Sequence, residues 1–378
     1  MIYLDNAATT RVCPEAAQAA LTAMTEGYGN PSSRYPLGHQ AAQRLEEDRA
    51  DVAKAMGCQS DEVVFTSCGT EGDNWAIQAA VEQGRRKGKH IITTAIEHSA
   101  VTLPIRGLER QGYEVTWLQP NAQGTVDLSQ LEAALRPDTI LVSMMLVNNE
   151  LGSVLPVAEA ARLVRRSGAP ALIHTDAVQG FLKVPFTPKE LGVDLLTISG
   201  HKIGAPKGVG ALYIRTGLDI KPILLGGGQE RGLRPGTEAT AQIAALAAAC
   251  RVGLENREKN ITHMASLKGY ALGRLTQAVP EIRQVGSGQA PHILALTLPG
   301  YKSEVLVRFL GDQGICISAG SACHKGKASD VFKAMPLSKG EREGAFRVSF
   351  CPNSATQDID ALADALVLAR DTLLPSMS

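Results

Sequence analysis

Short β-rich runs alternate with helical runs through the first two thirds of this 378-residue chain, and that alternation limits the possible folds more than any other feature. Runs rich in Val, Ile and Thr predict strands, and longer runs with helical periodicity predict helices. The predicted strands are 62–66, 90–94, 113–118, 139–146, 171–175 and 194–199, and the predicted helices are 70–84, 99–111, 127–135 and 156–167. Such alternation forms βαβ units with right-handed crossovers. The sequence therefore predicts an α/β fold with a mostly parallel sheet covered on both faces.

Polar clusters follow five of these predicted strands directly. They are Thr66–Asn74, Glu97–His98, Asn148–Glu150, Asp176 and Ser199–Lys202. Ligands of parallel α/β sheets bind at the carboxyl ends of the strands. We therefore expect these five clusters to meet at one binding site.

The last third of the chain changes in pattern. A long alanine-rich helical stretch runs from Glu238 toward Leu275, and shorter strands and helices follow it. The predicted strands are 292–298 and 345–350, and the predicted helices are 303–312 and 355–373. Because 378 residues exceed what one hydrophobic core usually supports, a smaller α+β domain packed on the larger one is expected.

Charge and cysteine content narrow the class of protein. Lys+Arg and Asp+Glu both number 38, so no net charge attracts nucleic acid or an anionic membrane, and a small-molecule substrate fits better. We expect neither a secretory signal nor a membrane span. The seven cysteines stand singly, without the paired spacing of a zinc site, so no metal and a reduced, cytoplasmic location are expected.

Lys202, which ends the tetrapeptide Ser-Gly-His-Lys, and Asp176 suggest pyridoxal phosphate chemistry. A lysine that condenses with an aldehyde must be partly deprotonated, which burial or a neighbouring cation favours. The pyridine ring of that cofactor withdraws electrons only when a carboxylate keeps its nitrogen protonated. Taken alone, the tetrapeptide more often marks an ordinary surface lysine.

The turn between strand 62–66 and the next helix has residues suited to a phosphate. Backbone N–H groups near Gly69 and the Thr70 hydroxyl would reach a phosphate at the positive helix end, and Ser199 and His201 could add contacts. The alternative is an ordinary turn in which Thr70 caps the helix. His98 could stack on the cofactor ring or be an ordinary polar residue, and Gln179 lies within reach of a ring hydroxyl.

Seven motifs in order resemble the cysteine desulfurase family. They are Tyr3–Thr10, Gly29–Ser33, Phe65–Ser67, Gly69–Glu71, Asn148–Glu150, Ser199–Lys202 and Gly226–Glu230. The resemblance runs from Tyr3 to about Leu373 and implies the class V aminotransferase branch of the fold-type I pyridoxal-phosphate enzymes. It implies a homodimer with a seven-stranded large domain, 15–255, and a small domain, 256–378, joined by the N-terminal segment 1–14.

The resemblance also implies roles for individual residues. Lys202 would bond covalently to the cofactor and act as the catalytic base, and Asp176 would contact the ring nitrogen. His98 would stack on the ring and take part in catalysis, and Gln179 would donate to the ring oxygen. The phosphate would be held by Gly69, Thr70, Ser199, His201 and, from the neighbouring subunit, Thr237. Asn149 would contact cofactor and substrate.

Ser318–Cys323 resembles the family's nucleophile loop, and a thiol flanked by Gly and Ser suits a residue that carries sulfur out of a pocket. Arg347 matches the arginine that grips the substrate α-carboxylate, for which its planar fork is suited. The function implied is removal of sulfur from L-cysteine, which gives L-alanine and a persulfide on Cys323 for an acceptor protein, as in iron–sulfur cluster assembly or tRNA thiolation. The alternatives are a selenocysteine lyase, another class V enzyme and a non-catalytic assembly scaffold.

Three positions depart from the family pattern. Cys68 stands where glycine is usual in the phosphate turn, and Cys351 also replaces a common glycine. The segment 324–328 is shorter and more basic than usual. These departures bear on the sulfur acceptor more than on the chemistry.

Overall fold

The computed structural model describes residues 1–320 and 329–375. Its larger part is a seven-stranded sheet in the order β2-β8-β7-β6-β5-β3-β4, in which only β8 runs antiparallel to its neighbours. The strands are β2 (Val63–Thr66), β3 (His90–Thr94), β4 (Glu114–Leu118), β5 (Thr139–Ser143), β6 (Leu172–Asp176), β7 (Leu195–Ser199) and β8 (Gly210–Ile214). The predicted α/β fold is confirmed.

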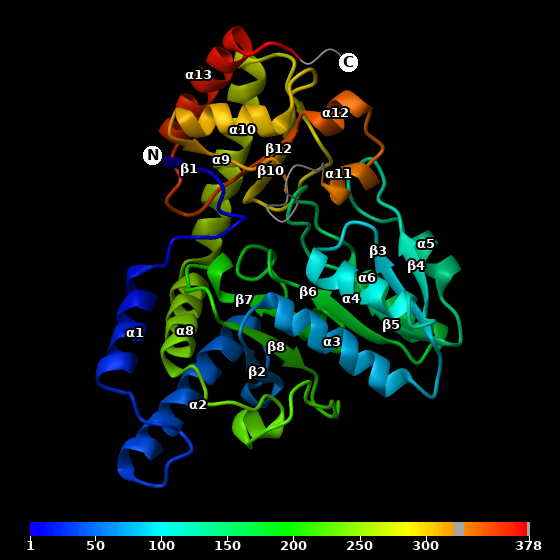
Figure 1. The fold of residues 1–378 in the computed structure, drawn as a ribbon, viewed down its shortest axis with the longest axis vertical. Coiled ribbons are helices and arrows are strands. Elements are labelled where there is room, and N and C mark those ends of the chain that lie inside the picture. Colours follow the sequence, from blue (N-terminus) through cyan, green and yellow to red (C-terminus); the bar gives the residue numbers. More distant parts are fainter. Residues whose placement is uncertain (321–328, 376–378) are drawn as a thin grey trace.

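Strands β2, β3, β5 and β7 carry side chains that are buried on both faces of the sheet, and helices cover both faces. The connecting helices are α3 (Gly69–Gly84), α4 (Ser99–Glu109), α5 (Leu128–Ala134), α6 (Val157–Ser167) and α7 (Pro188–Leu191). Two further helices, α1 (Pro14–Thr25) and α2 (Pro36–Met56), pack on α8 (Thr240–Glu255). Figure 1 shows α1, α2 and α8 grouped on the left of the sheet.

The long helix predicted from Glu238 toward Leu275 is instead two helices, and this prediction was wrong in that respect. α8 ends at Glu255 and α9 (Arg257–Ala278) begins after Asn256. The Asn256 side chain donates to the carbonyl oxygen of Val252 at 2.9 Å, so it competes with the backbone for a helical acceptor. The break lets α9 leave the sheet and enter the upper part of the molecule (Figure 1).

The upper part contains a three-stranded antiparallel sheet, β12-β10-β9, and the closing helices. Its elements are β9 (Arg283–Gln284), β10 (Ile293–Thr297), α10 (Ser303–Asp312), β11 (Ile315–Cys316), α11 (Asp330–Ala334), α12 (Lys339–Glu343), β12 (Ala345–Ser349) and α13 (Thr356–Thr372). The N-terminal strand β1 (Ile2–Tyr3) pairs with β11, and Leu4 packs in the same apolar cluster as Phe346 and Leu362. The boundary at residue 255 stays a prediction.

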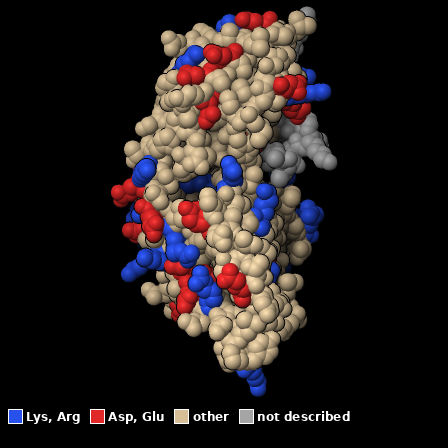
Figure 2. All heavy atoms as spheres, turned by 90° about the vertical axis from the view of Figure 1, so that its left-hand side faces the viewer, with Lys and Arg blue, Asp and Glu red and all other residues tan. Residues whose placement is uncertain are grey.

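Side chains of both charge signs lie near one another across the upper and middle parts of the face seen in Figure 2, and neither sign forms one large field there. Among residues 1–320 and 329–375, no helix is both long and apolar enough to cross a bilayer.

Candidate active site

A cavity of about 260 Å³ lies at the carboxyl ends of the parallel strands. Ten of the residues predicted for the site line it: Gly69, Thr70, His98, Asn149, Asp176, Gln179, Ser199, His201, Lys202 and Arg347. Thr237 is exposed and does not line this cavity of its own chain. Cys323 lies outside the described residues. The five polar clusters therefore meet at one edge of the sheet, as their positions after the strands predict.

The N-terminal segment positions Lys202. The Nζ atom of Lys202 donates to the carbonyl oxygens of Ala7 at 2.7 Å and Ala8 at 2.8 Å. Thr10 donates from its backbone N–H and its hydroxyl to the carbonyl oxygen of His201, both at 2.9 Å. The lysine therefore stands between the sheet edge and a segment nearly 200 positions earlier in the chain.

Asp176 ends β6 inside the cavity with 5% of its surface exposed. Burial, and then the nearby Asp73 carboxyl, raise the pKa of Asp176. His174 lies close to Asp73, with 3.5 Å between Nε2 and Oδ1, but burial lowers the pKa of His174 to about 4 and leaves it neutral near pH 7. A cationic group in the cavity would therefore favour the ionised form of Asp176, as a protonated pyridine nitrogen would.

The start of α3 is shaped for an anion. A Cβ atom at Gly69 would lie 2.9 Å from Cγ2 of Val178, so only glycine fits this close approach. Glu71 accepts from the backbone N–H of Ser67 at 2.8 Å and pairs with Arg234 at 3.0 Å, which holds the turn in place. The turn therefore presents the positive end of a 16-residue helix to the cavity.

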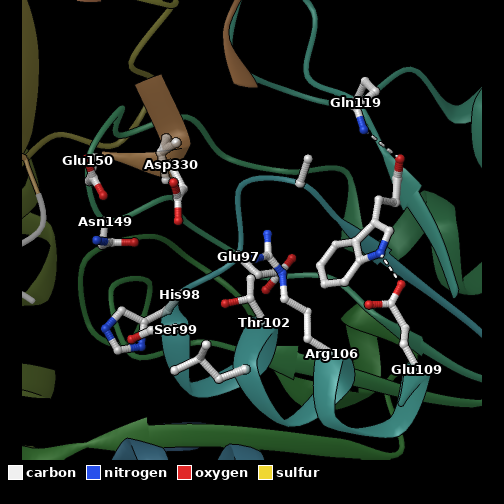
Figure 3. A pocket seen from close by; sticks show the side chains of 14 residues that line it. Glu97, His98, Ser99, Thr102, Arg106, Glu109, Gln119, Asn149, Glu150 and Asp330 are labelled. Atoms are coloured by element: carbon white, nitrogen blue, oxygen red, sulfur yellow. Dashed lines mark hydrogen bonds between the residues drawn. The ribbon is translucent and has the colours of Figure 1, made fainter. Parts of the chain in front are cut away.

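His98 caps α4, since its Nδ1 atom accepts from the backbone N–H of Ala100 at 3.2 Å. This bond fixes the imidazole at the cavity wall. His98 and Asn149 also line a second, larger cavity of about 690 Å³. Figure 3 shows that cavity, which Arg106 and Glu109 line. The Arg106 guanidinium lies 5.7 Å from the centre of the Trp117 ring, and the Trp117 indole N–H donates to Glu109 at 2.9 Å. The two cavities adjoin at His98 and Asn149.

Arg347 lies on β12 with 2% of its surface exposed. It donates to the backbone carbonyl of Asn149 at 2.6 Å and to Asp5 at 2.7 Å. Its Nε atom and the Oδ1 atom of Asn149 are buried without a hydrogen-bond partner among the residues described. One is a donor and the other an acceptor, so together they suit the carboxylate and the amino group of an amino acid.

Two other arginines, which follow the Gly-rich segment Gly226–Glu230, contact other groups. Arg231 donates to the carbonyl oxygens of Asp61 and Val63, and Arg234 pairs with Glu71. Neither lines the cavity that holds Lys202.

The sequence assigned no individual site role to five of the lining residues: Ala7, Ala8, Asp73, Met145 and Val178. Asp73 had a usable signal, because it lies three residues after Thr70 and hence on the same face of α3. Cys68, which replaces the glycine usual in the family, lines this cavity, so a thiol lies in the predicted phosphate turn.

Glu97 gives a pH-dependent prediction. Its Oε1 atom accepts from Thr94 and from the backbone N–H of Met145, and burial, followed by Asp176 and Asp73, raises its pKa from 4.5 to about 8. The folded protein therefore binds this proton more tightly than the unfolded chain does. The free energy of unfolding should decline as pH rises from 4.5 to about 8.

The variant Glu97→Gln lacks this titration and should gain stability relative to the wild type between pH 5 and 8. Urea unfolding of both proteins at the two pH values measures the difference, with the exposed Glu132→Gln as the control. An equal difference at both pH values would contradict the assignment.

Comparison with known proteins agrees with this geometry. The family described as Aminotransferase class-V matches residues 2–362. A cysteine desulfurase of Trichormus azollae is 41% identical over 370 residues, which cover 97% of this chain and 92% of that protein. The chain belongs to the cysteine desulfurase family. The cysteine desulfurase IscS of Clostridium botulinum (strain Hall) is 36% identical over 371 residues, 97% of this chain and 93% of that protein.

Solved structures agree with the family's fold. A NifS-like protein superposes with a TM-score of 0.93 at 34% identity, over 98% of this chain and all of that chain. A structure titled "SspA in complex with cysteine" superposes with a TM-score of 0.79 at 31% identity, over 94% of this chain and 100% of that chain. Within the described part of this chain, no group of three or more His, Cys, Asp or Glu residues could hold a metal ion.

Proposed function

We propose that this cysteine desulfurase uses pyridoxal phosphate to convert L-cysteine to L-alanine and transfers the sulfur to Cys323. The observation that carries the proposal is the meeting of Lys202, Asp176 and Arg347 at one cavity. A family relative whose structure is titled as a complex with cysteine supports the substrate. The role of Cys323 is proposed from the Ser318–Cys323 motif.

The cavity residues fit the cofactor. Lys202 would bond to it covalently, Asp176 would hold its ring nitrogen, Gln179 would donate to the ring oxygen and His98 would stack on the ring. The start of α3 at Gly69 and Thr70, with Ser199 and His201, would hold its phosphate. When bound, pyridoxal phosphate supplies the electron-withdrawing ring that makes the substrate Cα proton acidic.

Residues of this chain then bind the substrate, transfer the proton and accept the sulfur. Arg347 and Asn149 hold the amino acid, and the Lys202 amine takes the proton from Cα and later returns a proton to carbon. The Cys323 thiolate attacks the substrate sulfur, so an S–S bond forms while the C–S bond breaks, and the proton that the substrate thiol loses balances the one that the methyl carbon gains. The products balance as L-alanine and a persulfide on Cys323.

Thr237 supports a homodimer. It is exposed, and its segment also carries Leu225 and Leu224, which are 93% and 55% exposed. Apolar side chains this exposed favour a covered interface. We propose that Thr237 completes the phosphate site of the partner subunit.

The test measures alanine and sulfide from L-cysteine with excess dithiothreitol, which releases sulfide from a persulfide. Equal amounts of both products are expected. Pyruvate or a keto acid instead of alanine would indicate a transaminase or another lyase, and no turnover by the cofactor-loaded protein would indicate a scaffold. Faster turnover of selenocysteine than cysteine would indicate a selenocysteine lyase. Adding candidate iron–sulfur and tRNA-thiolation acceptors and following labelled sulfur identifies the pathway.

Replacing Arg347 with alanine should weaken cysteine binding while cofactor content stays unchanged. In the proposed complex Arg347 pairs with the substrate carboxylate. Truncating one partner of such a buried charge pair costs roughly 2–5 kcal/mol, because the other charge is left unpaired. The apparent dissociation constant should therefore rise about 30-fold or more, at ~1.4 kcal/mol per decade. Arg347→Lys should restore little, since an ammonium lacks the two-pronged fork.

Spectral titration of cofactor-loaded protein with cysteine measures this affinity. The exposed Arg308→Ala is the matched control. Normal binding by Arg347→Ala would show that the Arg347–Asp5 pair is only structural.

A further inference from the structure

A third cavity, of about 690 Å³, lies behind Lys202 and is not part of the proposed reaction. Its walls come from the N-terminal segment 6–17, the segments that follow β6, β7 and β12, and the junction of α8 with α9. Lys202 lines both this cavity and the one that holds Asp176. These elements lie on the left of Figure 1, on the face that Figure 2 shows hollowed between the upper and lower parts of the molecule.

Lys183 is the unusual residue of this cavity. It is only 8% exposed, and its Nζ atom has no hydrogen-bond partner among residues 1–320 and 329–375. Lysine is almost never buried without a partner, because the ammonium loses its hydration. Burial, and then the nearby Lys202, lower the pKa of Lys183 to about 7.

No carboxylate pairs with Lys183 in the part of the chain that the structure describes. Asp5 pairs with Arg347 at 2.7 Å, and Glu15, which also lines the cavity, is exposed to solvent. Cys351, which also lines the cavity, raises the pKa of Lys183, and Arg347 lowers it, so the lowering by burial and Lys202 prevails. The buried amine therefore stands in a region of excess positive charge, which an anion would neutralise.

The backbone next to Lys183 has an unfavourable conformation. Leu182, directly before it, has a φ of 60°, which is uncommon for a residue with a large side chain. Gly253 of α8 leaves room for Leu182, because a Cβ atom there would lie 2.6 Å from Leu182 Cδ1. Strained positions that neighbours hold in place are concentrated at functional sites.

Most of the cavity wall is apolar. Val252 and Ala249 of α8, Ile203 and Phe350 are among its side chains. A doubly charged phosphate would lose much hydration against such walls and meet one buried amine, whereas a carboxylate with an apolar body matches both features. An α-amino acid fits less well, because its ammonium would lie near Lys183 and Lys202.

We propose that this cavity binds a small carboxylic acid with an apolar body, whose carboxylate accepts a hydrogen bond from Lys183 inside walls formed by α8 and the N-terminal segment. The ligand would lie on the opposite side of Lys202 from the substrate. The site is independent of the desulfurase reaction, since none of the proposed catalytic steps uses Lys183.

Calorimetric titration of the cofactor-loaded enzyme with benzoate tests the proposal. Saturable binding of one benzoate per chain is expected, and Lys183→Met, which keeps the length but removes the charge, should weaken it about 10-fold or more. Lys189→Met, which removes an exposed lysine a few residues later, should leave it unchanged. The neutral benzyl alcohol should bind wild type and Lys183→Met alike.

A second variant covers the case in which Lys183→Met does not fold. Val252→Phe fills the cavity from α8 and should also weaken benzoate binding while it leaves Lys183 in place. Benzoate that binds both variants as tightly as it binds the wild type, or that shows no saturable binding to the wild type, would overturn the proposal. Displacement of benzoate by equimolar inorganic phosphate would overturn the carboxylate assignment. Calorimetry measures benzoate binding directly, so the outcome of this test does not depend on whether the protein produces alanine.

Discussion

Replacing Lys202 with alanine should remove alanine production and covalent cofactor attachment together. Lys202 supplies the only amine that the structure places in the cavity beside Asp176 and Arg347 within the described residues. Positioned acid–base groups contribute ~10²–10⁴-fold to rate, and the loss should exceed the middle of that range because the same amine also anchors the cofactor. Turnover of cysteine to alanine, measured by amino-acid analysis, should fall at least about 10³-fold.

The matched control is Lys207→Ala, which removes an exposed lysine from the same segment. Borohydride reduction of the wild type followed by peptide mapping should label Lys202. Labelling of Lys183 instead would show that the buried lysine of the adjoining cavity is the cofactor lysine. That result would exchange the roles of the two cavities.

Replacing Cys323 with serine should leave cofactor content and cysteine binding intact and stop alanine production. A serine hydroxyl stays protonated near neutral pH, whereas a thiol is a few per cent ionised and far more nucleophilic toward sulfur. Alanine formation should therefore fall at least about 100-fold, while spectral titration with cysteine still saturates.

Cys68→Ser and Cys351→Ser are the controls for this loss, because Cys68 lines the cofactor cavity and Cys351 lines the cavity behind Lys202. Both should keep most of the alanine production. Wild-type alanine release by Cys323→Ser, together with its loss in Cys68→Ser, would assign the sulfur-accepting thiol to the phosphate turn.

Local patterns were sufficient for most of the sheet. The strands around Asp176 and Ser199 were predicted within one residue, because short apolar runs bounded by polar residues leave little freedom of assignment. The strand predicted to extend to Leu146 ends at Ser143, although the backbone N–H groups of Met144 and Leu146 still donate to His174 and Asp176 of β6. The single helix predicted beyond Glu238 failed at Asn256, where one side-chain hydrogen bond outweighs helical periodicity.

The sequence by itself determined the α/β class, the edge of the sheet at which the polar clusters meet and the family, because each depends on order along the chain and on residue type. Only the tertiary structure decided which groups surround Lys202: the carbonyl oxygens of Ala7 and Ala8, and the buried Lys183. It also decided the pairing of Arg347 with Asp5, which are 342 positions apart. Contacts across such separations leave no periodic signal, because they depend on how the N-terminal segment and the last strand pack together once both have folded.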